Sequence, residues 1–205
     1  MKQLTTTEPL SRFLEPAVFI DVGDSAIGDF VEERLADLDP IEATRTVFHF
    51  IRDEISHSWD IQSHRVTRSA IDVFTYREGI CYAKSHLFAA LLRRAGIPTG
   101  ICYQRLTLLD DVSGGYAVHA LNTVYLEALG RWIRLDARGN KPGIEAEFSL
   151  GDEVLAFPIR SEYDEVDYYV NLSKPHPVIV ETLLRNDDAI AMYRSRLPSR
   201  LEFEE

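Results

Sequence analysis

The pattern of apolar residues in the central part of this chain changes close to Gly96, and this change limits the folds that are possible. Before Gly96, apolar side chains recur at the spacing of amphipathic helices. After it, segments rich in β-branched and aromatic residues alternate with turn residues, which is typical of strands. Helices are expected over residues 26–38, 40–56, 70–76 and 81–95, and strands over 99–109, 117–126 and 131–137. Helices followed by an antiparallel sheet predict an α+β fold.

Weaker patterns near both ends of the chain extend this core. The short apolar stretches at 17–22 and 178–180 are interpreted as strands, and 186–196 is expected to form a final helix. No internal repeat or low-complexity linker divides the sequence, so we expect a single domain. Its expected parts are a core at 40–145, an N-terminal helical extension at 1–39 and a C-terminal extension at 146–205, which together make up residues 1–205.

The charge balance and the cysteine content restrict the partners and the compartment. The chain has 33 acidic residues against 22 lysines and arginines, which gives a net charge of −11. A broadly acidic surface argues against nucleic acid or an anionic membrane as the main partner. Two cysteines make no disulfide framework, and neither a signal-peptide pattern nor a run of ~18 apolar residues occurs. We expect a cytoplasmic protein, and the sequence does not indicate its oligomeric state.

Cys81 stands two residues after Gly79, at the start of the helix with the clearest apolar stripe. The first N–H groups of a helix lack intrahelical partners and carry partial positive charge, which favours a thiolate over a thiol. The same groups can stabilise the negative oxygen that forms when a carbonyl is attacked. Because free cysteines are also often small buried hydrophobic residues, this position alone does not assign a role to Cys81.

A thiolate nucleophile requires an imidazole and a group that orients that imidazole. His119 lies near the start of the second expected strand, and Asp136 lies near the end of the third. If these strands pair antiparallel through a turn at Gly130, the start of one lies beside the end of the other. His86 is about 140° around the helix from Cys81, so we expect it at the surface. We therefore predict a catalytic triad of Cys81, His119 and Asp136.

A metal site built from Cys81, Cys102 and histidines is a competing interpretation. The spacings match no regular zinc pattern, and Cys102 lies in an apolar strand segment where a core position is expected. The sequence also lacks a phosphate-binding glycine loop and a dinucleotide fingerprint. We expect neither a metal nor a cofactor.

Several short motifs in a fixed order resemble the transglutaminase-like superfamily. They are Arg77-Glu-Gly-Ile-Cys-Tyr-Ala-Lys-Ser, Arg94-Ala-Gly-Ile-Pro, His119-Ala leading into Val124-Tyr-Leu, and Arg131-Trp-Ile-Arg-Leu-Asp136. The resemblance covers residues 70–145, with weaker support from the helix at 40–56. The His119 strand lacks the Trp and Glu that are common in the family, and Ala-Arg-Gly-Asn follows Asp136 where Pro-Thr is frequent.

The resemblance implies a papain-like cysteine-hydrolase core in which a nucleophile helix packs on an antiparallel sheet. Cys81 would be the nucleophile, His119 the base and Asp136 the group that orients the base. The implied substrate is a peptide, a protein or a small amide, which is attacked through an acyl-enzyme. Transfer of the acyl group to water would make the protein a protease or amidase, and transfer to an amine would make it an acyltransferase; hydrolysis is favoured.

Two further points follow from the resemblance. Some members of the family supply a second oxyanion donor upstream of the nucleophile, and Trp59, Gln62 and His64 are the candidates in this chain. The alternative to an enzyme is an inactive domain that binds proteins or peptides, but such relatives usually lack a member of the triad.

Overall fold

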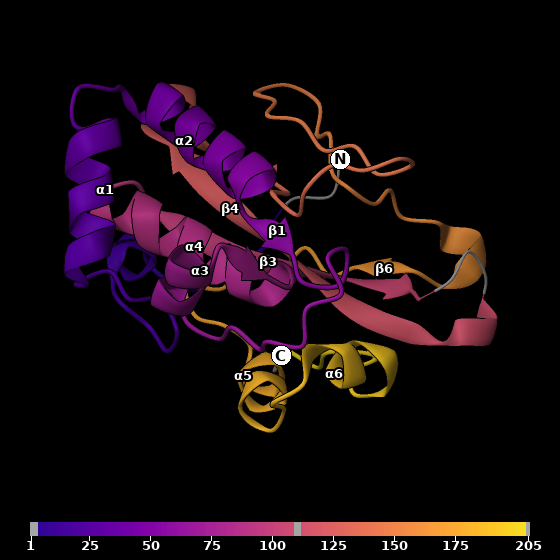
Figure 1. Cartoon of the computed structure of the whole chain (residues 1–205). Coiled ribbons are helices and arrows are strands. Elements are labelled where there is room, and N and C mark those ends of the chain that lie inside the picture. Colours follow the sequence, from indigo (N-terminus) through magenta and orange to yellow (C-terminus); the bar gives the residue numbers. More distant parts are fainter. Residues whose placement is uncertain (1–3, 109–111, 204–205) are drawn as a thin grey trace.

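An antiparallel sheet forms one layer of the molecule, and the helix that begins at Cys81 packs across it (Figure 1). The computed structural model describes residues 4–108 and 112–203. Within these ranges the main sheet has the strand order β5-β4-β3-β6. Its strands are β3 (Thr99–Thr107), β4 (Tyr116–Leu126), β5 (Arg131–Leu135) and β6 (Val166–Asp167). The three predicted strands and the α+β class are confirmed, while Leu109, the last residue of the first predicted strand, lies outside the described residues.

The helical layer precedes the sheet in the chain, as the sequence predicts. It consists of α1 (Ser25–Leu35), α2 (Pro40–His49), α3 (Ala70–Tyr76) and α4 (Cys81–Arg94). The side chains of Asp24, Asp39 and Ser69 cap the first three helices by accepting backbone N–H groups. Helix α4 lies between the other three helices and the strands β3 and β4, so nearly all of its residues are buried.

Two predicted elements near the N-terminus differ from the structure. The stretch 17–22 is not a strand, because only a single bridge joins Ala17 to Ile20 across a turn in which Phe19 has a φ of 66°. The helix predicted at 40–56 ends at His49 and continues as the π-helical turn η2 (Phe50–Glu54). The chain then enters β1 (Ser56–His57), which pairs in parallel with β2 (Glu78–Gly79).

The C-terminal extension also departs from prediction. The run at 178–180 is part of a helix, α5 (Pro177–Leu184), rather than a strand. Pro177 has the fixed φ of a first helical residue, and His176 caps the helix by accepting the Val178 N–H. The final helix, α6 (Ala189–Ser195), is shorter than the predicted segment at 186–196 because Asp188 caps its start.

One continuous hydrophobic core holds these elements together. It extends from Ile20 to Leu201 and includes residues of the helical layer, the sheet and the C-terminal segment. The Val118 N–H donates to the carbonyl oxygen of Pro198 at 2.9 Å, which ties the C-terminal segment to β4. None of the helices in the described ranges combines the length and the apolar character needed to cross a bilayer.

Candidate active site

Cys81 is the first residue of α4 and lies half-buried in the wall of a cavity of about 620 Å³. No side chain caps this helix, because its N-cap position is Ile80. The N–H groups of the first turn are therefore available to a ligand, and their partial positive charge is directed at the cavity. The predicted position of Cys81 at a helix N-terminus is confirmed.

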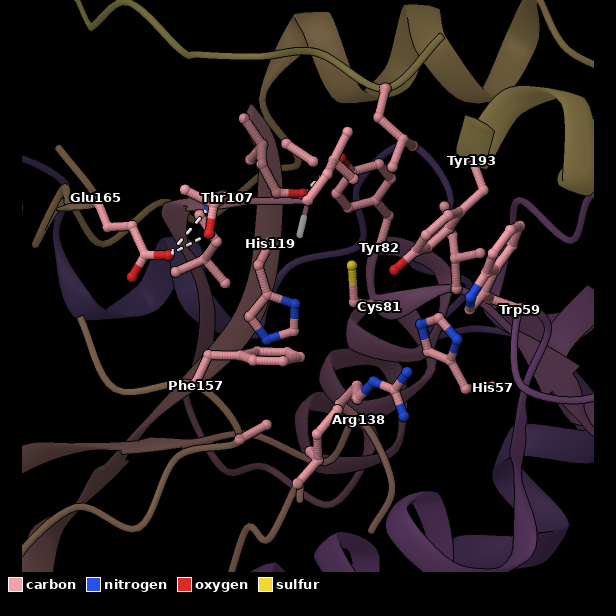
Figure 2. A pocket seen from close by; sticks show the side chains of 18 of the residues that line it. His57, Trp59, Cys81, Tyr82, Thr107, His119, Arg138, Phe157, Glu165 and Tyr193 are labelled. Atoms are coloured by element: carbon pink, nitrogen blue, oxygen red, sulfur yellow. Dashed lines mark hydrogen bonds between the residues drawn. The ribbon is translucent and has the colours of Figure 1, made fainter. Parts of the chain in front are cut away.

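His119 and Asp136 meet beside this cysteine. His119 lies on β4, and Asp136 follows the last residue of β5, which pairs antiparallel with β4. Nε2 of His119 is 2.8 Å from Oδ2 of Asp136, and Figure 2 shows the imidazole next to the Cys81 sulfur. The strand pairing that the sequence predicts thus brings His119 into contact with Asp136, on the side of the cavity where Cys81 lies.

The buried Asp136 carboxylate is held by two further donors. Its Oδ1 accepts the Arg138 N–H and its Oδ2 accepts the Ala156 N–H, each at 3.2 Å. Burial alone raises the pKa of Asp136, but His119 and these backbone N–H groups lower it below its ordinary value. The carboxylate therefore remains ionised and fixed in one orientation.

The ionised carboxylate sets the charge state of the imidazole. Burial lowers the pKa of His119, but Asp136 and Cys81 outweigh burial and raise the pKa to about 10. Phe157 packs edge-on against the imidazole, with ring centroids 5.0 Å apart, and covers it from solvent. A protonated His119 beside Cys81 can pair with a thiolate and can deliver a proton to a leaving group.

The cavity has an aromatic wall on the other side of Cys81. Trp59 and Tyr193 stack with ring centroids 4.3 Å apart and an interplanar angle of 13°. Tyr193 comes from α6, so the C-terminal segment forms part of the cavity. At the far end, Glu165 accepts hydrogen bonds from Thr107 and Arg160 (Figure 2).

Three charged side chains around the site, Arg138, Lys141 and Lys84, all have polar partners. Arg138 makes a bidentate ion pair with Asp60, and the Lys141 ammonium lies 2.6 Å from the same carboxylate. Burial raises the pKa of Asp60, but Arg138 and Lys141 lower it to about 2. Lys84 is fully buried and donates to the backbone carbonyls of Ile55 and Arg138, each at 2.7 Å.

The structure separates the three candidates for a second oxyanion donor. Trp59 lines the cavity. Gln62 and His64 do not: the Gln62 amide donates to the Trp59 carbonyl, and His64 pairs with Asp188 at 2.7 Å on the surface. His57 and Tyr193 also line the cavity. The irregular polar segment at 57–69 is a sequence signal that His57 faces a cleft, whereas no such signal marks Tyr193.

The second cysteine lies apart from this site. Cys102 is completely buried in β3, and burial raises the pKa of its thiol far above the ordinary value. Across the described ranges, no group of three or more His, Cys, Asp or Glu side chains is placed to hold a metal ion.

Comparison with known proteins gives one family and a distant structural likeness. Residues 30–137 match the family model described as "Transglutaminase-like superfamily". A crystal structure described as "a Putative Cysteine Protease from Cytophaga hutchinsonii" is similar, with 20% identity and a TM-score of 0.47. The alignment covers 66% of this chain and 46% of that protein, so this chain spans less than half of its length. No curated protein matches the chain.

Proposed function

Because the chain belongs to the transglutaminase-like superfamily, we propose that it is an enzyme that cleaves amide or related acyl bonds through an acyl-enzyme on Cys81. His119 acts as the acid and base, and Asp136 orients it. The observation that carries the proposal is that His119, which is hydrogen-bonded to Asp136, lines the same cavity as Cys81 at the start of α4.

The reaction follows from this arrangement in two halves. The Cys81 thiolate attacks the carbonyl carbon, the carbonyl π electrons move to oxygen, and N–H groups at the start of α4 stabilise the oxyanion. The oxyanion collapses, the C–N bond breaks, and the amine leaves with the proton that His119 donates. Water then attacks the thioester while His119 takes its proton, and collapse of the second oxyanion breaks the C–S bond, which releases the carboxylic acid and restores the Cys81 thiolate beside protonated His119.

The same intermediate allows acyl transfer when an amine replaces water. Hydrolysis is the primary proposal. Glu165 is the one carboxylate among the described residues that line the cavity, and it already accepts hydrogen bonds from Thr107 and Arg160, so a second amine would have to compete with them. A cavity of about 620 Å³ accommodates a peptide segment or a small amide.

The domain proposed to carry this activity extends beyond the segment that matches the family. We propose that residues 1–205 act as one transglutaminase-like domain in which the C-terminal extension at 146–205 completes the substrate cavity. Support comes from the shared hydrophobic core and from the cavity residues Phe157, Glu165 and Tyr193, which lie beyond the family match at 30–137.

Trapping the acyl-enzyme tests this proposal without knowledge of the natural substrate. The full chain is mixed with p-nitrophenyl acetate, quenched in acid and digested, and the acetylated peptide is identified by mass spectrometry. We expect a burst of nitrophenolate and one acetyl group on Cys81, with no burst in Cys81→Ala and a normal burst in Cys102→Ser. A wild-type chain without a burst would favour the inactive binding domain.

A further inference from the structure

His57 lies next to the N-terminus of the nucleophile helix because of backbone pairing. In the parallel pair of β1 and β2, the Cα of His57 is opposite Gly79, two residues before Cys81. The Ser58 N–H donates to the Gly79 carbonyl at 3.2 Å and fixes this register. Figure 2 shows His57 and His119 on opposite sides of Cys81.

The His57 side chain is buried, and one of its ring nitrogens lacks a hydrogen-bond partner among the described residues. Its exposed fraction is 6%, and its Nδ1 has no hydrogen-bond partner in the described part of the chain. Three other buried side-chain atoms there share this state, on Ser58, Gln104 and Asn171, but His57 alone among these residues lines the cavity. An unpaired buried polar group lowers the stability of the folded protein. A hydrogen bond between His57 and a bound ligand would remove this cost.

The surroundings of His57 keep its imidazole neutral. Burial lowers the pKa of His57 well below its ordinary value, and the nearby cations Arg138 and Lys84 lower it further. A neutral imidazole cannot replace His119 as the positive partner of a thiolate, but it still carries one N–H donor. Tyr193 packs edge-on against the ring, with centroids 6.2 Å apart, which limits its rotation.

We propose that His57 is a further catalytic residue, which donates a hydrogen bond to the oxyanion formed when Cys81 attacks a substrate carbonyl; this inference rests on the proposed function. The second donor is the backbone N–H of Cys81, at the start of the same helix. The His57 N–H donates a hydrogen bond to the negatively charged oxygen of the tetrahedral intermediate. The proton is not transferred and stays on His57 when the intermediate collapses and the C–N bond breaks. Trp59 also lines the cavity, but it is only half-buried, whereas the pairing of β1 with β2 holds the buried His57 beside the start of the helix.

The test compares two reactions of the same thiol in the full chain. Acylation by p-nitrophenyl acetate passes through an oxyanion, whereas alkylation by iodoacetamide displaces iodide at a saturated carbon and forms none. We expect His57→Phe, which keeps an aromatic ring but has no N–H, to slow acylation about 100-fold. Its alkylation rate should stay within about twofold of wild type, since the Cys81–His119 pair is intact. The matched control His49→Phe changes a histidine outside the cavity and should alter neither rate.

The outcomes separate this inference from the proposed function. Wild-type acylation in His57→Phe, or an equal loss of acylation and alkylation, would overturn the donor role. If His57→Phe does not fold, the pair His57→Gln and His57→Ala decides: the glutamine amide retains an N–H and should acylate at least tenfold faster than the alanine variant. Equal rates for that pair would contradict the inference, and a wild-type chain without acylation would refute the proposed function itself.

Discussion

Lys84 lies one turn after Cys81 on α4 and ties together three parts of the candidate site. Its ammonium donates to the carbonyl of Ile55, just before β1, and to that of Arg138, just after Asp136. The side chain is 2% exposed. Replacing it with methionine in Lys84→Met keeps the length of the chain but removes both the charge and the two hydrogen bonds.

The effect on stability depends on pH in a predictable direction. Burial, followed by the charge of Arg138, lowers the pKa of Lys84 from 10.5 to about 7 in the folded protein. Between these values the unfolded chain binds more protons than the folded one, so the contribution of Lys84 to stability rises with pH. Integrating this difference from pH 7 to pH 9 gives a gain of about 2 kcal/mol for wild type, and Lys84→Met lacks it.

Urea unfolding of both chains at pH 7 and pH 9 measures this difference. Lys84→Met should be less stable at both pH values, because two buried carbonyls lose their donor. The deficit relative to wild type should grow by about 2 kcal/mol at pH 9. Lys174→Met controls for the loss of one positive charge. A deficit that stays constant, or that shrinks with rising pH, would refute the assignment of Lys84 as a buried amine.

Three further substitutions test neighbouring parts of the site. Asp136→Asn replaces a carboxylate that accepts three N–H groups with an amide, which cannot accept all three. The rate of Cys81 acylation, measured by nitrophenolate release, should fall about 10³-fold or more. A loss below tenfold would contradict the orienting role. Since the pKa of His119 is raised from 6.5 to about 10, its contribution to stability is complete below pH 6.5 and is lost as pH rises through 10. Urea titration of His119→Phe should lack this alkaline loss, and a variant with the wild-type pH dependence would argue against the buried ion pair. Arg138→Met removes the bidentate partner of Asp60 and should lower the free energy of unfolding by about 3 kcal/mol. A change below about 1 kcal/mol would show that Lys141 alone is enough to stabilise the Asp60 carboxylate.

The sequence predicts those parts of the fold that local pattern controls. Helices α3 and α4 and the strands β3, β4 and β5 have strong periodicity and clear end signals, and their order is enough to bring His119 beside Asp136. The prediction fails at 178–180, where three β-branched residues favour a strand. A proline at the first helical position and the cap from His176 outweigh that propensity and form α5.

The burial of individual side chains and the composition of the far cavity wall depend on contacts between distant elements, which local sequence patterns do not predict. His86 was expected at the surface because it lies away from Cys81 on the helix, but α4 is covered on its outer side as well. His86 is therefore buried, 1% exposed, with Nδ1 at 2.8 Å from the Arg68 carbonyl. In the same way, only the folded C-terminal segment places Tyr193 against Trp59, a contact between residues more than a hundred positions apart.

Alkylation of Cys81 by iodoacetamide across a pH series, in wild type and His119→Ala, tests the thiolate–imidazolium pair most directly. Peptide mass spectrometry reports each cysteine separately, and the buried Cys102 serves as an internal control that stays unlabelled in the folded chain. The account predicts rapid labelling of Cys81 already at about pH 6 in wild type, slowed at least about tenfold by loss of His119. Slow labelling that increases only toward alkaline pH, at the same rate in both chains, would contradict it.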